Sequence, residues 1–445
     1  MWARFFMSVP LDLMTSVEVT PSQLDRFACL LDPQWIDEAL TATGTASIRH
    51  RRLPAEQVVW LVIGLALFRN EPIWHIVHQL GLDQRPQAGA PAPSAAIGAR
   101  QRLGSAPLAW LFNRLAHHWT DQAEAAIPGF HGLRSFAVDG VIWDVPDTPE
   151  NRQAYDGGSS QFGAGAWPQV RAACLMETST HLIRAACFGG YRHSELSYAR
   201  QLIAHAPDHS LTLFDRQYFA AAFLRDWQQG GIERHWLMRA RSPLRYDVVQ
   251  TFAPGDWRVR MPVSPQARAQ RADLPTHWEA RLIEYQVGGV ARRYLTSLLD
   301  PQTYPAREVV AHYTERWEIE LGFREIKQGM QQKAPVLRSK KPELLEQEIW
   351  GVLIAYDLIR QEMREMAADL HVAPNRLSFQ WLSLAITTAL CQWPLETPGT
   401  FPKRLALLRQ QARLYLLPPR RPRSYPRAVK QRSRAYPIKN ASQLN

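Results

Sequence analysis

Four polar residues in the second half of the chain have a spacing that could do chemistry. Tyr313, Arg316, Glu320 and Lys327 are separated by two, three and six residues. On an α-helix, at about 100° per residue, all four fall within an arc of about 60°. Beside them lies an apolar stripe that could pack on a core, formed by Ile319, Phe323, Ile326 and Met330. Such a helix presents a carboxylate, two cations and a phenol in one row.

The simplest alternative is a ladder of surface ion pairs. An Arg316–Glu320 pair at positions i and i+4 would stabilise the helix by only about 0.2–0.5 kcal/mol. That gain does not account for a tyrosine and a lysine in the same row. We therefore favour a functional role for this row of side chains.

Two aspartates could form a site for a metal ion. Asp139 follows the apolar run 135–138, and Asp215 follows the apolar run 211–214. Each is expected at the end of a short strand, where an aspartate is often only a turn former. Together the two aspartates indicate a metal site more strongly than either does alone, because hard cations such as Mg²⁺ prefer carboxylate oxygens that converge from adjacent strands. Three further acidic residues compete as ligands, namely Asp144, Asp147 and Glu195.

These residues require a mixed α/β framework. Apolar periodicity predicts helices from about residue 21 to 125, including one over 55–68. Strands are expected over 170–176, 181–188 and 211–214, and helices over 195–206 and 220–228. The stretch 241–300 has the texture of a small β-rich insertion, and helices resume after Pro305. Strands followed by alternating strands and helices indicate a mixed α/β domain.

The net charge of +11 over 445 residues is unevenly distributed. From Lys403 to the end there are 12 lysines and arginines and no acidic residue, so the tail carries the excess. Such a tail suits a polyanion such as nucleic acid, although a solvated tail has the same composition. The arginines Arg100 and Arg102, on a predicted helix that begins near Ser94, could also bind DNA or could lie on a charged bundle face.

Composition excludes several classes of protein. The apolar and charged fractions, 46% and 21%, are those of an ordinary globular protein. Four cysteines without a C-x-x-C pair argue against a disulfide scaffold or a structural zinc site. The longest apolar run, residues 58–68, is too short to span a bilayer, and no secretory signal is evident. We expect an intracellular protein that binds no membrane.

The spacing Y-(2)-R-(3)-E-(6)-K resembles the signature of the insertion-element-four family of transposases, which have an RNase H-like DDE core. Further motifs resemble the same family along nearly the whole chain: Asp139-Gly140 with 146–151, 213–216, 337–339 with 347–350, Ser47-Ile48-Arg49, and 100–104. The resemblance implies a helical N-terminal DNA-binding domain over 1–130. It also implies an RNase H-like catalytic domain over 131–375 with the insertion at about 241–300, and a helical C-terminal region with a basic tail over 376–445.

The resemblance also implies a site and a reaction. Asp139, Asp215 and Glu320 would hold two Mg²⁺ ions, for which Mn²⁺ could substitute, and Tyr313, Arg316 and Lys327 would contact phosphates. An aromatic residue of the insertion would stack on a flipped base; no motif identifies it, and we take Trp257 as the candidate, with Trp278 in a similar setting. The expected activity is metal-dependent cleavage and strand transfer by a cut-and-paste route, on double-stranded DNA of element ends and target. A homodimer in a synaptic complex and a bacterial, nucleoid-associated cytoplasmic location are also implied.

Two other classes of protein remain open. One is an RNase H-like endonuclease that nicks DNA without joining it. The other is a non-catalytic DNA-binding relative, against which the complete set of signature residues argues.

Overall fold

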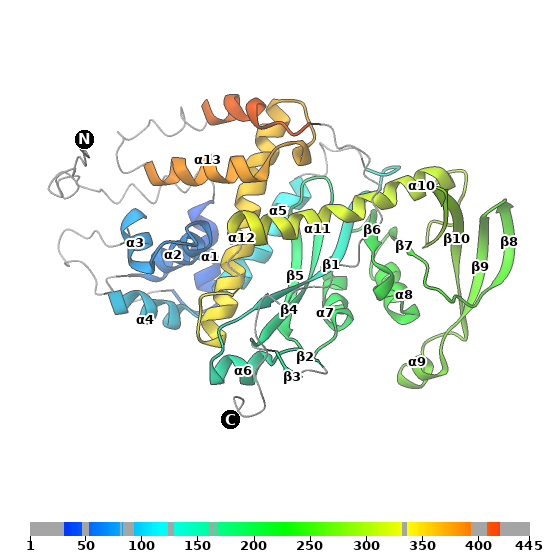
Figure 1. Cartoon of the computed structure of the whole chain (residues 1–445), viewed down its shortest axis with the longest axis horizontal. Helices are drawn as coiled ribbons and strands as arrows, with labels where there is room; N and C mark the ends of the chain where they lie inside the picture. Colours follow the sequence, from blue (N-terminus) through cyan, green and yellow to red (C-terminus); the bar gives the residue numbers. More distant parts are fainter. Residues whose placement is uncertain are drawn as a thin grey trace, which may run out of the picture.

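The computed structural model has a large mixed sheet flanked by helices (Figure 1). It describes residues 31–46, 53–80, 82, 93–122, 129–160, 163–165, 167–331, 336–392 and 407–418. The motif Ser47-Ile48-Arg49 and the basic tail beyond residue 418 lie outside these residues.

The central sheet has nine strands in the order β5-β4-β1-β6-β7-β11-β10-β9-β8. Their bounds are β1 (Arg134–Asp144), β4 (Gln169–Glu177), β5 (Ile183–Gly190), β6 (Ser210–Phe214), β7 (Arg234–Arg239), β8 (Asp247–Ala253), β9 (Asp256–Pro262), β10 (His277–Val287) and β11 (Val290–Thr296). A separate two-stranded hairpin is formed by β2 (Ser159–Ser160) and β3 (Gly163–Ala164).

The five core strands have the RNase H-like arrangement. Strand β4 pairs antiparallel with both β1 and β5, whereas β6 pairs parallel with β1 and with β7. The prediction of an α/β core with this topology is confirmed. The strands of the predicted insertion extend the same sheet, because β11 pairs antiparallel with β7.

Helices precede, cover and follow the sheet. They are α1 (Pro33–Ala42), α2 (Ala55–Leu67), α3 (Ile73–Gln79), α4 (Pro93–Leu103), α5 (Ala106–Gln122), α6 (Pro149–Tyr155), α7 (Glu195–Gln201), α8 (Ala221–Gln229), α9 (Pro265–Gln270), α10 (Ala306–His312), α11 (Trp317–Arg324), α12 (Pro342–Asp369) and α13 (Phe379–Gln392). Short 3₁₀ turns are η4 (Leu202–His205), η5 (Arg216–Tyr218), η6 (Tyr313–Arg316), η8 (Pro374–Arg376) and η10 (Ala412–Tyr415), and η7 (Glu325–Met330) is a π-helix.

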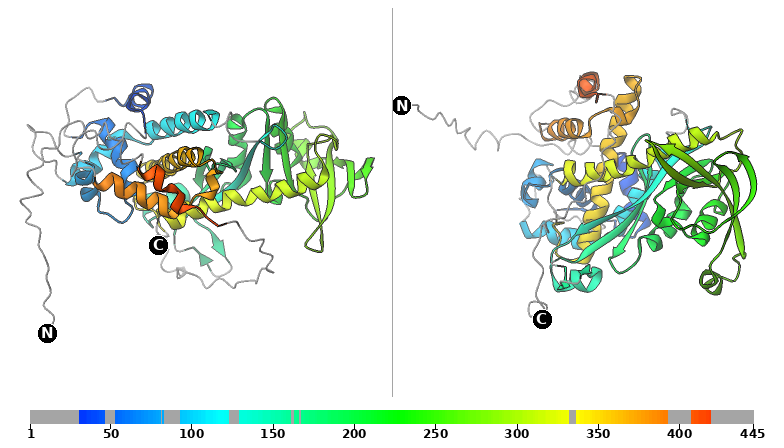
Figure 2. Two further views of the ribbon diagram at one scale, coloured as in Figure 1. Left: turned by 90° about the horizontal axis from the view of Figure 1, so that it is seen from above. Right: turned by 45° about the vertical axis from the view of Figure 1, so that its right-hand side comes forward.

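Helix α12 joins the N-terminal helices to the sheet. It lies between α2 and the strands in Figures 1 and 2, and it contacts both α2 and α5. Apolar side chains on all sides of α2 are buried, which agrees with the predicted helix over 55–68. One continuous core therefore runs from the N-terminal helices to one face of the sheet, and α7 and α8 pack in a second core on the other face.

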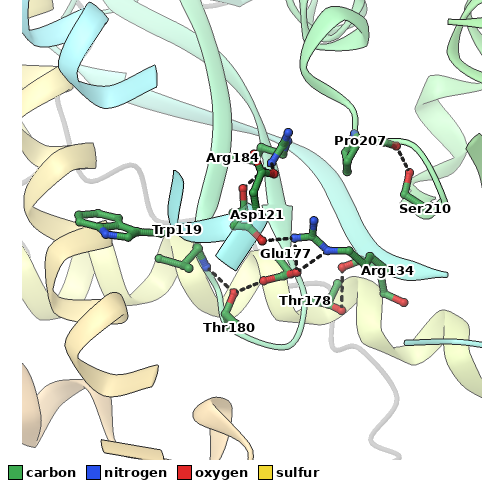
Figure 3. Close-up of polar contacts among 12 residues, drawn as sticks. Trp119, Asp121, Arg134, Glu177, Thr178, Thr180, Arg184, Pro207 and Ser210 are labelled. Carbon is green, nitrogen blue, oxygen red and sulfur yellow. Dashed lines mark hydrogen bonds and ion pairs between the residues drawn. The ribbon is translucent and has the colours of Figure 1, made fainter. Parts of the chain in front are cut away.

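Ion pairs fix the end of α5 to the first strands (Figure 3). Arg134 of β1 donates to Glu177 of β4 at 2.8 Å and to the Thr120 carbonyl at 2.7 Å. Arg184 of β5 pairs with Asp121 at 2.6 Å. These contacts lie at the start of β1, so they hold in place the strand that carries Asp139.

No helix in the described part of the chain has the length and apolar character needed to cross a membrane.

Candidate active site

Asp139 and Asp215 come from neighbouring parallel strands. In the register of β1 and β6, Val138 pairs with Phe214, and each aspartate is the next residue. The two side chains therefore leave the sheet at the same level, where β6 ends. Asp215 caps the turn η5, accepting a hydrogen bond from the Gln217 amide at 2.7 Å.

One detail of the sequence prediction is wrong: Asp139 does not end its strand. Strand β1 continues to Asp144, and Asp139 itself pairs with Cys174 of β4. An Asp-Gly pair between two apolar runs is typical of a turn, but β4 is long enough to keep β1 extended through Gly140. Asp139 lies at an end only with respect to β6.

Glu320 approaches from α11, and Arg316 joins it to Asp139. The Arg316 guanidinium donates to Glu320 Oε1 at 2.6 Å and lies 3.7 Å from Asp139 Oδ2. Arg316 is buried, with 7% of its surface exposed. The structure thus brings Asp139 and Glu320 to opposite sides of one buried cation.

The helix that carries Glu320 is less regular than the sequence predicted. Residues 313–330 form a 3₁₀ turn (η6), a short α-helix (α11) and a π-helix (η7) rather than one α-helix. A uniform 100° per residue therefore does not hold across the four signature residues. Glu320 lies in the α-helical part, and Lys327 lies in the π-helix.

The Asp139 carboxyl is poorly solvated. Burial raises its pKa from 3.8 to about 7, and the carboxylates of Glu195 and Glu320 act in the same direction. The Gly140 amide and Arg316 lower the pKa but do not compensate for burial. An ionised Asp139 is therefore a costly charge in the folded protein, as expected of a group that serves function rather than stability.

Replacing Asp139 by asparagine should stabilise the metal-free protein in a pH-dependent way. Because the folded pKa lies above the unfolded value, the carboxyl group's contribution to stability falls as pH rises from about 4 to about 7. We expect Asp139→Asn to raise the unfolding temperature at pH 8 and to change it little at pH 4. Thermal unfolding with a chelator present measures this, and an equal shift at both pH values would contradict it.

Tyr313 and Lys327 bond to the main chain of the two strands. The Tyr313 hydroxyl donates to the Phe214 carbonyl at 3.0 Å, and burial raises its pKa to about 12. Lys327 Nζ donates to the Ile142 carbonyl at 2.7 Å. These bonds fasten the signature helix on either side of Asp139 and Asp215. Phosphate contacts by Tyr313, Arg316 and Lys327 stay a prediction.

A cationic groove opens beside Asp215 that the sequence did not reveal. Besides Arg316 and Tyr313, its lining includes Arg216, Arg239, Arg292 and Arg307. Two partly exposed aromatic side chains also line it: Tyr285, 37% exposed, and Trp317, 44% exposed. These residues come from five segments between 215 and 317, so only the folded chain brings them together.

Trp257 does not lie in this groove. It sits on β9 opposite Leu282, half-buried against the second core. Of the aromatic residues that line the groove, Tyr285 and Trp317 are the most exposed. The position of Trp257 therefore does not favour the stacking role that we assigned to it.

Arg100 also differs from its prediction. It is buried, with 4% of its surface exposed, and it donates to Gln347 Oε1 at 2.7 Å and to the Leu344 carbonyl at 3.1 Å. It fastens α4 to α12 and is not available to a phosphate. Arg102, on the same helix, is exposed and remains a candidate DNA contact.

The donor set of the site fits a hard divalent cation. Asp139, Asp215 and Glu320 offer only carboxylate oxygens, which Mg²⁺ and Mn²⁺ prefer. In the described residues, no three His, Cys, Asp or Glu side chains stand close enough together to coordinate an ion as placed. Arg316 lies between two of these carboxylates and pairs with both Asp139 and Glu320.

Comparisons with known proteins identify the family of the chain. Residues 21–113 match the family "Insertion element 4 transposase N-terminal", and residues 131–358 match "Transposase DDE domain". The chain is 40% identical over 428 residues to "Transposase InsG for insertion sequence element IS4" of Escherichia coli (strain K12), with 96% of each chain covered. It is 35% identical over 252 residues to "Putative transposase InsZ" of the same organism, covering 55% of this chain and 82% of that one.

Among solved structures, the fold is similar to a piggyBac transposase in a synaptic complex with hairpin DNA. The TM-score is 0.40 at 9% identity, over 96% of this chain and 92% of that chain.

The fold and the matched families define a DDE transposase. The chain belongs to the insertion element 4 family and is the transposase of an insertion sequence. Transposases bind DNA, and DDE transposases generally use divalent metal ions.

Proposed function

We propose that this transposase cuts DNA at the ends of its insertion sequence and joins the freed ends to a target by a cut-and-paste route. The observation that carries this proposal is that Asp139 and Asp215 leave neighbouring parallel strands at the same level, while Arg316 links Asp139 to Glu320, beside an arginine-lined groove. We assign these three carboxylates as the catalytic residues and metal ligands. Two Mg²⁺ ions, or Mn²⁺ in their place, would activate the attacking oxygen and stabilise the leaving one.

The protein's own residues position the reacting phosphate. Arg316 is neutralised by Asp139 and Glu320 as the structure stands. With the carboxylates holding metal ions, the Arg316 guanidinium would be free to donate two parallel hydrogen bonds to oxygens of a phosphate. Tyr313 and Lys327 hold the strands of Asp139 and Asp215 against the helix of Glu320, so the three carboxylates keep their spacing.

The groove beside Asp215 is the surface to which we assign the double-stranded DNA of element ends and target. Its arginines would neutralise phosphates, and Trp317 or Tyr285 would stack on a base. We further propose a homodimer in the synaptic complex, end binding by the domain over 1–130 with Arg102 as a contact, and the bacterial cytoplasm, at the nucleoid, as the place of action.

Removing an arginine of the groove should weaken DNA binding in a salt-dependent way. We expect Arg292→Gln and Arg307→Gln each to lower the affinity for element ends. Each should also reduce the slope of log K against log salt by about 0.9, as for one lost phosphate contact. Fluorescence anisotropy at several salt concentrations measures this. Arg200→Gln, at an exposed site on α7, is the matched control, and slopes equal to the control would contradict the assignment.

A joining assay tests the proposed function as a whole. Purified protein is incubated with Mg²⁺, a target plasmid and a linear fragment that ends in the DNA flanking its coding sequence. We expect cleaved ends and joined product. Cleavage without joining would identify a non-joining endonuclease, and binding without cleavage would identify a non-catalytic relative.

A further inference from the structure

We infer that Glu195 is a positioning residue that sets the spacing of the two catalytic aspartates. This inference rests on the proposed role of Asp139 and Asp215 as metal ligands. Glu195 opens α7, in the first turn after the cap Ser194, and its side chain is half-buried. The Glu195 side chain contacts the backbone at Gly140, next to Asp139, and it also contacts the turn η5, which Asp215 caps.

The first contact is with the strand of Asp139. Gly140 faces the side of the sheet opposite to Asp139, and the Glu195 carboxylate occupies the space where any other residue would have its Cβ. A Cβ at position 140 would displace this carboxylate, and the φ of Gly140 is not in the left-handed region, so the contact with Glu195 is what favours a glycine here. The Gly140 amide in turn donates to Asp139 Oδ1 at 2.9 Å. Glu195 thus supports the peptide that orients Asp139.

The second contact is with the turn of Asp215. The Tyr218 hydroxyl donates a short hydrogen bond to Glu195 Oε1. Tyr218 is 1% exposed and ends the turn η5, and its own amide donates to the Asp215 carbonyl at 3.1 Å. One carboxylate therefore connects the turn that Asp215 caps with the strand that carries Asp139.

This arrangement gives Glu195 a role through its shape and its acceptor oxygen. The partner of Oε1 is a hydroxyl donor, and the neighbour of Oε2 is a glycine, so a neutral amide of the same shape can make both contacts. If the role is positioning, glutamine should serve in place of glutamate. Groups that orient metal ligands typically contribute 10–100-fold in metal affinity.

Binding of Mn²⁺ to the full-length, DNA-free protein tests the inference without relying on activity. Electron paramagnetic resonance reports the free ion during a titration. We expect Glu195→Ala and Tyr218→Phe each to weaken Mn²⁺ binding about tenfold, while Glu195→Gln stays within about twofold of the wild type. Glu343→Gln, an exposed glutamate in the first turn of α12, is the matched control. Circular dichroism confirms that each variant is folded.

The outcomes separate the inference from the proposed function. If Asp139→Asn binds Mn²⁺ as tightly as wild type, the proposed metal site is wrong. If Asp139→Asn loses the ion but Tyr218→Phe keeps it, the metal site stands and the role of Glu195 is overturned. The role is equally overturned if Glu195→Gln is as weak as Glu195→Ala, because the charge would then be what matters.

A double-mutant cycle with Gly140 provides an independent test. Gly140→Ala places a methyl group against the Glu195 carboxylate and should weaken Mn²⁺ binding in the wild-type background. In the Glu195→Ala background, the same substitution should have little further effect, because the displaced side chain is gone. Equal losses in both backgrounds would overturn the inference.

Discussion

Replacing Asp139, Asp215 or Glu320 by its amide should reduce cleavage at the element ends by at least about a thousandfold. Each substitution keeps the side-chain shape but removes an anionic oxygen from the set that we assign to the metal ions. The affinity for end DNA should change little, because the arginines that line the groove remain in place. Single-turnover cleavage of a labelled end, with binding measured in parallel, tests both expectations.

Glu284→Gln is the matched control for this experiment. Glu284 lies on β10 of the insertion and pairs with Arg293 on the exposed surface. The Glu284→Gln variant should cleave the element ends at the wild-type rate. Cleavage at near the wild-type rate by any one of the three amide variants would remove that residue from the triad.

Replacing Arg360 by methionine should lower the free energy of unfolding by about 3–5 kcal/mol. Arg360 of α12 is 1% exposed, forms a short ion pair with Glu325, and donates to His181 Nδ1 at 2.7 Å. Because a guanidinium only donates, His181 Nδ1 accepts, and its Nε2–H donates to Glu318 at 2.8 Å. Methionine fills the volume but leaves the Glu325 carboxylate without its main counter-charge.

Urea unfolding measures this loss, and its pH dependence identifies the cause. Burial acts to raise the pKa of Glu325, but the Arg360 guanidinium opposes burial through its charge and its hydrogen bond, and this pKa is about 2, below its ordinary 4.5. The ionised carboxylate therefore contributes stability that is present above about pH 4.5 and lost as pH falls towards 2. In Arg360→Met this contribution should be absent.

Arg293→Met is the control, because it removes the cation of an exposed ion pair with Glu284. This substitution should lower the free energy of unfolding by at most about 1 kcal/mol. If Arg360→Met lowers the free energy of unfolding by no more than Arg293→Met does, the stabilising role of the buried pair is contradicted.

This same buried cluster explains why the regularity of the signature helix could not be predicted. Glu325 begins the π-helix η7 and is held by Arg360, 35 residues later, while His181 holds Glu318 from 137 residues earlier. Local apolar periodicity reports which face of a helix is buried. It does not report which residues, distant in sequence, pair with the helix and accompany its change in winding.

The strands, the helices and the topology of the core could be predicted more fully than the winding of the signature helix. The apolar runs over 170–176 and 211–214 are strands β4 and β6, and the fold class is confirmed. The apolar run 135–138 before Asp139 was also expected to be a strand, but the continuation of that strand beyond Asp139 depends on pairing with β4, which the local sequence does not encode.

The site itself was predictable only in part. The spacing of Tyr313, Arg316 and Glu320 pointed to the helix, whereas the arginine groove is assembled from segments that share no motif. Arg100 looked like a surface cation because its partner Gln347 is 247 residues away. Long-range pairing of this kind decides whether an arginine binds DNA or fastens two helices.

Anomalous diffraction from crystals of the protein with end DNA and Mn²⁺ tests the central claim most directly. The account predicts anomalous peaks among the carboxylates of Asp139, Asp215 and Glu320, with the guanidinium of Arg316 turned to a phosphate. Strong Mn²⁺ peaks elsewhere on the protein, with none among these carboxylates, would contradict it.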